Sequence, residues 1–185
     1  MSNVAHNWVI QTRNPYEIIA SEAWENLAPG VQLGLTPPLE AAGVLKVERA
    51  TTGIAGFIAR MILLPPNGEK VEAHLSLIVS GEAVQWTRSF GLMMAVSRQT
   101  FSTHTYIEEA GPFKMVFRLV SQGTALAHSQ VSTRIFGIPV PMFLGPLVVG
   151  LMSEGPTDRS WRLDVDIRHQ WFGRICRYEG VMHAQ

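Results

Sequence analysis

Residues Val71–Phe90 read VEAHLSLIVSGEAVQWTRSF, and this stretch decides the fold. Its first half alternates: Val71, Ala73, Leu75, Leu77 and Val79 share one face, and Glu72, His74 and Ser76 lie on the other. A period of two with one apolar face is typical of a half-buried antiparallel strand. The segment Ser80–Glu82 then reads as a turn that returns the chain into a second strand, so the stretch predicts a β-hairpin.

The second strand of this hairpin places a charge on its apolar face. Val84, Trp86, Arg88 and Phe90 lie on the same side of AVQWTRSF. A buried unpaired guanidinium costs several kcal/mol, so Arg88 needs a partner. Two alternatives stay open: a salt bridge to Glu108, Glu109 or Asp164, or a donor that faces the carboxylate or enolate of a ligand.

Further strands follow along the chain at short intervals. The expected ranges are 43–50, 99–108, 112–120, 124–135, 161–169 and 174–182. Helical spacing and capping residues predict an amphipathic helix over 15–27, and a second, shorter helix over 54–64 ends at two prolines. We therefore expect an α+β fold: a curved or closed antiparallel β-sheet, barrel-like with about eight strands, an N-terminal helix and one further short helix. Closed sheets of this size hold one small ligand.

Length and composition bound the organisation and the partners. A chain of 185 residues suits one domain, which we place at 15–183 after a flexible N-terminus at 1–14. Fifteen basic and fifteen acidic residues cancel, and no basic run appears, so we expect no nucleic-acid partner. A single cysteine, Cys176, forms no internal disulfide, and the N-terminus lacks the features of a signal peptide. A cytoplasmic protein fits these observations.

Nineteen consecutive uncharged residues run from Ile135 to Ser153. Three prolines and three glycines interrupt them, so we exclude a transmembrane span and expect only a helical turn or two in LVVGLM after Pro146. One interpretation is a loop and short helix that plug one end of the sheet. The other is a lid over an apolar cavity, or a lip at 138–152 that makes peripheral contact with a membrane.

Candidate site residues follow from these patterns. We expect catalytic roles for Arg88, for Tyr178 in apolar surroundings and for His104 as a proton carrier, although a histidine on a strand is more often only hydrogen-bonded. The ligand-binding set that we expect is Trp86, Phe90, Met115, Phe117, His128, Arg134 and Phe143. No histidine pair has the spacing of a metal site, so we predict no metal. Glu108 and Glu109 precede Gly111-Pro112, which favours turn residues over a catalytic base.

Several separate motifs together resemble one known family. They include AWENLAPGV at 23–31, GVLKVE at 43–48, the W-x-R-x-F of Trp86, Arg88 and Phe90, and GRICRYEG at 173–180. In order and spacing they resemble the bacterial domain of unknown function 4166 family, from about Tyr16 to Met182. The family pattern has a histidine after the exit loop of the first helix, where this chain has Leu33-Gly34. Members of that family are either stand-alone proteins or C-terminal segments attached to oxidoreductase-like domains, and the resemblance implies that this chain is of the stand-alone kind. The chain has no G-x-G-x-x-G motif, so no nucleotide cofactor is expected.

The leading functional hypothesis is a barrel that encloses an apolar small molecule. Within it we favour a cofactor-independent cyclase or isomerase of a polyketide- or terpenoid-like substrate, as in natural product biosynthesis, because such catalysis needs a shaped cavity more than a nucleophile. The alternatives are a non-catalytic carrier of lipids or other hydrophobic ligands and an accessory partner of an oxidoreductase. A homodimer is left open.

Overall fold

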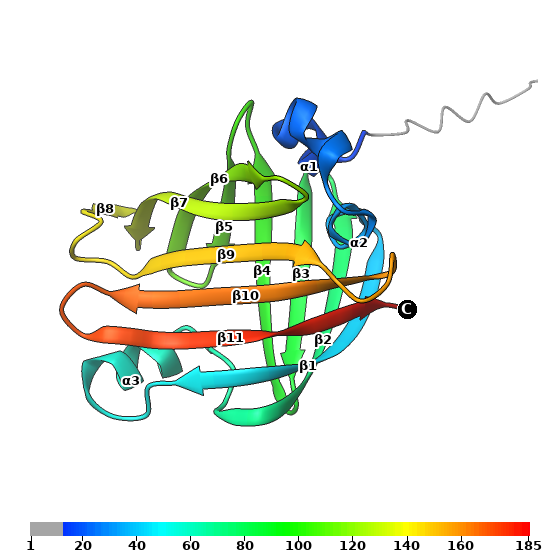
Figure 1. Cartoon of the computed structure of the whole chain (residues 1–185). Coiled ribbons are helices and arrows are strands. Elements are labelled where there is room, and N and C mark those ends of the chain that lie inside the picture. The colour runs from blue at the N-terminus through cyan, green and yellow to red at the C-terminus, as the bar shows by residue number, and fades with distance from the viewer. Residues whose placement is uncertain (1–12) are drawn as a thin grey trace, which may run out of the picture.

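The computed structural model describes residues 13–185, and the predicted flexible segment 1–14 lies outside them apart from Arg13 and Asn14. Short helices precede and interrupt the sheet (Figure 1). They are α1 (Pro15–Ala20), the 3-10 helix η1 (Ser21–Asn26), α2 (Pro29–Leu33) and α3 (Gly53–Met61). The Asn14 side chain accepts a hydrogen bond from the Tyr16 backbone N–H, and Pro15 occupies the first turn, so α1 begins where its capping residues predict.

Eleven antiparallel strands make up the sheet of the described chain. Their bounds are β1 (Leu39–Arg49), β2 (Gly68–Ser80), β3 (Ala83–Phe90), β4 (Met93–Phe101), β5 (Tyr106–Ala110), β6 (Phe113–Gln122), β7 (Ala125–Ile135), β8 (Ile138–Val140), β9 (Leu147–Glu154), β10 (Ser160–His169) and β11 (Gly173–Ala184).

The sheet closes on itself. Its order is β6-β5-β4-β3-β2-β1-β11-β10-β9-β7, and β7 pairs with β6 to complete a barrel of ten strands in residues 13–185, with β8 added to β7 as a short hairpin. In Figure 1 strands β9 to β11 cross in front of β2 to β4 at a steep angle. The predicted closed antiparallel barrel is confirmed, with ten strands instead of about eight. The predicted Val71–Phe90 hairpin is β2 and β3, paired from Ala73–Phe90 to Ser80–Ala83.

One end of the barrel is closed by the N-terminal helices. Tyr16, Val31 and Leu35 are fully buried there, and the Ala28 N–H donates to the Thr124 carbonyl in the β6–β7 turn. Gly30 lies so close to the Ser160 backbone that a Cβ would meet its carbonyl oxygen at 1.8 Å. The α1–α2 segment is therefore packed as a plug.

Two strands were wrongly assigned from the sequence. The expected strand 99–108 is in fact the end of β4, an exposed turn and the start of β5. The helical turn expected in LVVGLM is strand β9, because residues 147–154 pair with 161–168 of β10 and residues 149–152 pair with 126–129 of β7. No helix within residues 13–185 has the length and apolar character that crossing a bilayer would require.

Candidate functional site

The barrel is hollow. It holds a cavity of about 210 Å³, lined by inward side chains of most strands and by the connection from α3 to β2. The apolar part of the lining includes Leu45, Leu75, Trp86, Phe90, Met115, Phe117, Val148, Met152, Leu163 and Val165. Leu63 lines the cavity and is also 51% exposed, so the cavity reaches the surface beside α3. Small-molecule sites have this character, a largely apolar wall with a few polar groups.

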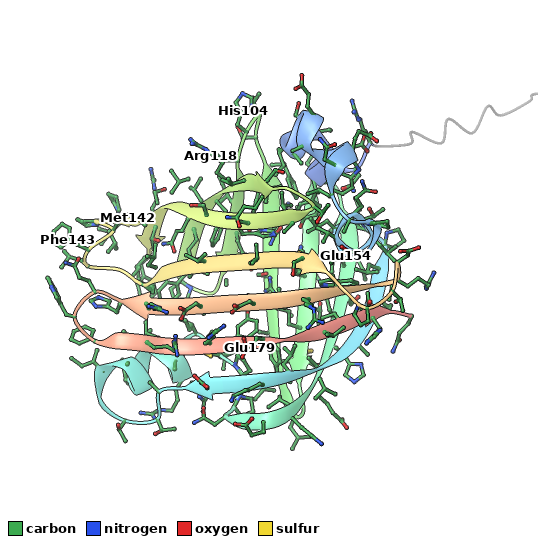
Figure 2. All side chains as sticks on the ribbon, in the orientation of Figure 1. His104, Arg118, Met142, Phe143, Glu154 and Glu179 are labelled. Carbon is green, nitrogen blue, oxygen red and sulfur yellow. The ribbon has the colours of Figure 1, made fainter. Side chains whose placement is uncertain are left out.

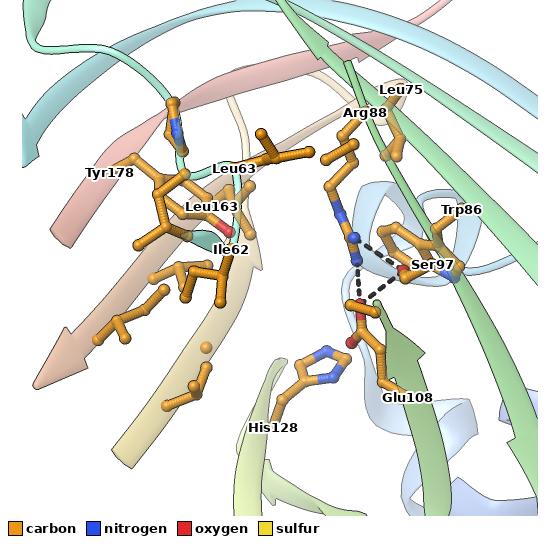
Figure 3. A pocket seen from close by; sticks show the side chains of 18 of the residues that line it. Ile62, Leu63, Leu75, Trp86, Arg88, Ser97, Glu108, His128, Leu163 and Tyr178 are labelled. Carbon is orange, nitrogen blue, oxygen red and sulfur yellow. Dashed lines mark hydrogen bonds and ion pairs between the residues drawn. The ribbon is translucent and has the colours of Figure 1, made fainter. Parts of the chain in front are cut away.

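A compact polar cluster occupies one wall (Figure 3). Arg88 on β3 donates from Nη2 to Glu108 Oε1 on β5 at 2.9 Å, and from Nη1 to Ser97 Oγ on β4, also at 2.9 Å. Ser97 Oγ in turn donates to Glu108 Oε1 at 2.7 Å. The Arg88 guanidinium also lies 4.8 Å from the centre of the Trp86 ring, within the range of a cation–π contact.

The cluster continues to the N-terminal plug. Gln99 Nε2 donates to Glu108 Oε2 at 3.2 Å, and Gln99 Oε1 accepts from the Tyr16 hydroxyl. The same hydroxyl accepts from Trp86 Nε1 at 2.6 Å. The hydrogen bonds among Tyr16, Trp86, Gln99 and Glu108 thus connect helix α1 to the polar wall of the cavity.

The ion pair makes the cluster neutral as a whole. Burial raises the pKa of Glu108, but attraction by Arg88 and the hydrogen bond from Ser97 outweigh it, and its pKa lies below the usual value. Burial is likewise the largest single influence on Arg88 and lowers its pKa, but attraction by Glu108, the hydrogen bond to Glu108 and attraction by neighbouring tyrosines together outweigh it, so its pKa is raised. Both groups are therefore charged at neutral pH, and their charges cancel.

His128 on β7 lies beside the Glu108 carboxylate (Figure 3). Its Nδ1 pairs with the Tyr106 hydroxyl at 2.8 Å, whereas its Nε2 is buried without a partner among the described residues. Burial lowers its pKa to about 4, so the ring is neutral at physiological pH. Because Tyr106 is buried and its hydroxyl proton has no other acceptor within residues 13–185, that hydroxyl donates to Nδ1, which leaves the proton of the neutral ring on Nε2.

Two polar atoms of the cavity wall have no hydrogen-bond partner in residues 13–185 and are still accessible. They are Arg88 Nε and the Tyr178 hydroxyl, since the inaccessible orphans are only Arg49 Nε and His128 Nε2. Tyr178 packs against Phe90 with ring centres 6.0 Å apart, and burial raises its pKa to about 12. The wall therefore offers two donors to a guest, one from a guanidinium and one from a phenol.

Seven of the ten predicted site residues line this cavity, and their role in binding stays a prediction. They are Arg88, Tyr178, Trp86, Phe90, Met115, Phe117 and His128. The open choice for Arg88 is resolved in favour of Glu108, one of the three carboxylates considered. That pairing coexists with the cavity, because Arg88 uses only part of its guanidinium on Glu108 and Ser97.

The other three predicted site residues lie outside the cavity. His104 is exposed in the turn between β4 and β5, and Figure 2 shows it pointing away from the barrel. Arg134 is exposed because the register of β7 shifts near Val131, so that inward positions pass from Gln130 to Thr133. Phe143 is 53% exposed on the connection from β8 to β9, where its ring packs 6.2 Å from Trp171.

Sequence reasoning missed most of the polar cluster. Ser97 and Gln99 point inward on β4 while Met94 and Val96 point outward, so the usual pattern is inverted. Their i, i+2 spacing, in the segment that follows the predicted strand with the inward Arg88, would have indicated two polar side chains on the same face. Glu108 was assigned to a turn, but it lies within β5.

The uncharged stretch 135–153 is neither plug nor lid as a unit. Its last part forms β9, a strand of the barrel wall, with Val148, Gly150 and Met152 on the cavity side. Its middle part, with Ile138 and Phe143, is exposed beyond the barrel end. In residues 13–185 no three His, Cys, Asp or Glu side chains converge as a metal site would require.

Comparisons with known proteins agree with this fold. The family model described as a domain of unknown function, DUF4166, matches residues 37–182. Among solved structures, a protein of unknown function from the DUF3598 family of Nostoc punctiforme aligns with a TM-score of 0.54 and 10% identity, over 80% of this chain and 47% of that one. The chain thus spans about half the length of that protein. Rv2717c from M. tuberculosis aligns with a TM-score of 0.50 and 12% identity, over 86% of this chain and 99% of that one.

Identities this low indicate a shared barrel and nothing about activity. A search of curated proteins gave no match.

Proposed function

Since the chain belongs to the DUF4166 family, whose description states no activity, we propose from the cavity itself that this protein binds an apolar small molecule carrying one polar group. The observation that carries the proposal is the hollow of about 210 Å³ in the barrel, with an apolar wall and a single polar cluster. An empty apolar cavity forfeits packing contacts, so a barrel kept only for stability would be expected to fill it.

The polar cluster indicates what the ligand carries. Arg88 and Glu108 neutralise each other, so a ligand carboxylate would bring an uncompensated negative charge into the barrel. A carbonyl or hydroxyl oxygen instead suits the two donors without partners, Arg88 Nε and the Tyr178 hydroxyl. This differs from the carboxylate that Arg88 alone suggests.

Ligand binding is tested by filling the cavity. Ala95 lies on its wall, and the preceding residue, Met94, is 63% exposed on the outer face of β4. We expect Ala95→Trp to abolish fluorescence enhancement of the apolar probe N-phenyl-1-naphthylamine, and Met94→Trp to leave it unchanged. Native mass spectrometry of the purified protein should show a retained organic molecule that Ala95→Trp lacks. Equal probe binding by both folded variants would refute the proposal.

A catalytic role is the finer hypothesis: a cofactor-independent cyclase or isomerase of a polyketide- or terpenoid-like substrate. The observation in its favour is the pair of donors on the cavity wall that have no protein partner in residues 13–185, Arg88 Nε and the Tyr178 hydroxyl; the ring nitrogens of His128 do not reach the cavity, because Nδ1 pairs with Tyr106 and Nε2 is inaccessible. Arg88 Nε and the Tyr178 hydroxyl would stabilise negative charge that develops on the polar group of the substrate. The alternatives are a carrier that only transports its ligand and an accessory partner of an oxidoreductase.

Turnover separates the catalyst from the carrier. The molecule extracted from the wild-type protein, and its dehydrated or isomeric forms, are incubated with wild type, Tyr178→Phe and His128→Gln. A catalyst converts one form into another, and we expect Tyr178→Phe to lower the rate at least about a hundredfold while probe binding persists, and His128→Gln to change the rate little. A carrier returns every compound unchanged, and in it Tyr178→Phe lowers affinity alone.

A further inference from the structure

Large apolar side chains are exposed at one end of the barrel, opposite the helices α1 and α2. Figure 2 shows Met142 and Phe143 there, at the end where Figure 1 places α3, β8 and the β10–β11 turn. Six of these side chains, with exposed fractions from 47% to 78%, define what we call the apolar rim. They are Phe57, Met61, Phe136, Ile138, Phe143 and Trp171.

The rim is one surface built from three separate segments. The Phe143 and Trp171 rings meet with centres 6.2 Å apart, and the His169 ring beside Trp171 hydrogen-bonds the Leu144 carbonyl. Helix α3, which carries Phe57 and Met61, packs against β11 directly after the β10–β11 turn. Contiguous apolar patches of this kind on a folded chain mark interaction surfaces.

The rim also borders the entrance of the cavity. Leu63, two residues after Met61, both lines the cavity and is exposed at this end. Whatever covers the rim therefore also faces the entrance.

Charge separates the two ends of the barrel. The rim segments 50–67, 136–146 and 169–173 contain one residue of fixed charge, Arg60, and Arg134 stands at the base of β8. Neither arginine forms an ion pair with a carboxylate of residues 13–185, and Arg60 donates only to the Thr51 carbonyl. The helices and turns of the opposite end carry more acidic than basic residues, with Glu22, Glu25, Glu82 and Asp158 against Arg159.

We infer that the apolar rim docks on an anionic phospholipid bilayer, with the cavity entrance against the lipid. Aromatic and aliphatic side chains then enter the headgroup and acyl boundary, and Arg60 and Arg134 contact lipid phosphates. The acidic opposite end orients the molecule away from the surface. Exchange of an apolar ligand with the bilayer rests on the proposed ligand binding, whereas docking itself does not.

Flotation with vesicles tests docking without any ligand. Vesicles of phosphatidylcholine with about 30% phosphatidylglycerol should carry the wild-type protein upward, and pure phosphatidylcholine should carry much less. We expect Phe143→Asp with Trp171→Asp to reduce binding to the anionic vesicles at least about tenfold. Arg60→Gln with Arg134→Gln should reduce binding by about 25-fold, at roughly fivefold for each arginine.

The control is Ile18→Asp, which introduces one aspartate at a half-exposed apolar residue of α1 on the opposite end, and it is compared with Phe143→Asp alone as well as with the double variant. It should float like wild type, and all variants should keep the wild-type unfolding midpoint and N-phenyl-1-naphthylamine binding, since the altered side chains are exposed. Loss of flotation with probe binding retained separates this inference from the proposed function. No flotation of wild type, or a soluble dimer that Phe143→Asp with Trp171→Asp dissociates, would overturn it, because a second copy would then cover the rim.

Discussion

The Glu108 carboxylate is the acceptor that holds the polar cluster together, and Glu108→Gln removes its charge with little change in shape. In the wild type it accepts from Arg88, Ser97 and Gln99. An amide has only one oxygen. If that oxygen keeps the bonds from Arg88 and Ser97, the new NH₂ group faces the Gln99 NH₂ group, and two donors meet.

Rotation of the Gln99 amide does not repair the network. Its NH₂ group would then point at the Tyr16 hydroxyl, which already accepts from Trp86 and would lose the acceptor for its own proton. One hydrogen bond is lost in either arrangement. In addition, Arg88 keeps its charge inside the barrel with no counter-charge nearby.

The structure supports a large cost for this change. The side chains of Arg88 and Glu108 are 23% and 12% exposed, and removing one partner of a buried ion pair costs about 3–5 kcal/mol. For a chain of this length, that corresponds to a decrease in Tm of roughly 10 °C. The control is Glu109→Gln, which breaks the surface pair with Lys114 and should cost about 1 kcal/mol or less.

The measurement is urea unfolding at pH 7 and at decreasing pH. Since the pKa of Glu108 in the folded state lies below the ordinary value of 4.5, its stabilisation is complete above about pH 4.5. It is lost as the pH falls through the lower pKa of the folded state. The difference between wild type and Glu108→Gln should therefore narrow at acidic pH. A difference below about 1 kcal/mol at pH 7, or one equal to that of Glu109→Gln, would refute the reasoning.

Three further predictions concern other parts of the barrel. The pKa of His128 falls from 6.5 to about 4 on folding, so the free energy of unfolding of the wild type should decrease as the pH drops from 6.5 toward 4. In urea unfolding at several pH values, His128→Gln should show a smaller decrease over this range. An equal decrease in both proteins would contradict the burial of a neutral ring. Burial raises the pKa of the Cys176 thiol to about 12, so Ellman's reagent should label it only after unfolding, and rapid labelling of the native protein would show it to be accessible. Gly30→Ala should destabilise the chain by about 1–3 kcal/mol or more in urea, because its Cβ would meet the Ser160 carbonyl oxygen at 1.8 Å, and a neutral effect would mean that α2 does not pack tightly on β10.

The elements that the sequence predicted are those with one apolar face. β2 and β3 alternate strictly, and the alternation also placed Arg88 inward. The sequence did not predict β4, because its inner face carries Ser97 and Gln99 and its outer face carries apolar side chains. β9 was predicted as a helical turn instead of a strand, because apolar residues occupy both of its faces and its hydrophobicity therefore shows no alternation.

The candidate site was predictable only in part for a related reason. Position along a strand predicts which face of the sheet a side chain points to, unless an extra residue interrupts the alternation. The irregularity near Val131 is such an interruption, and it turns Arg134 outward. The partner of Arg88 was one of three carboxylates by sequence, because Glu108 lies two strands away in a register that local pattern does not encode.

The sequence by itself determined antiparallel strands with one apolar face, in a curved or closed sheet, and an arginine on one of those faces, because successive side chains along a strand point to opposite sides of the sheet. Only the tertiary structure decided that β6 and β7 close the sheet, that Arg88 meets Glu108, and that the interior stays hollow. The physical reason is separation along the chain: closure, ion pairing and cavity volume depend on side chains that come together only when distant strands have found their register.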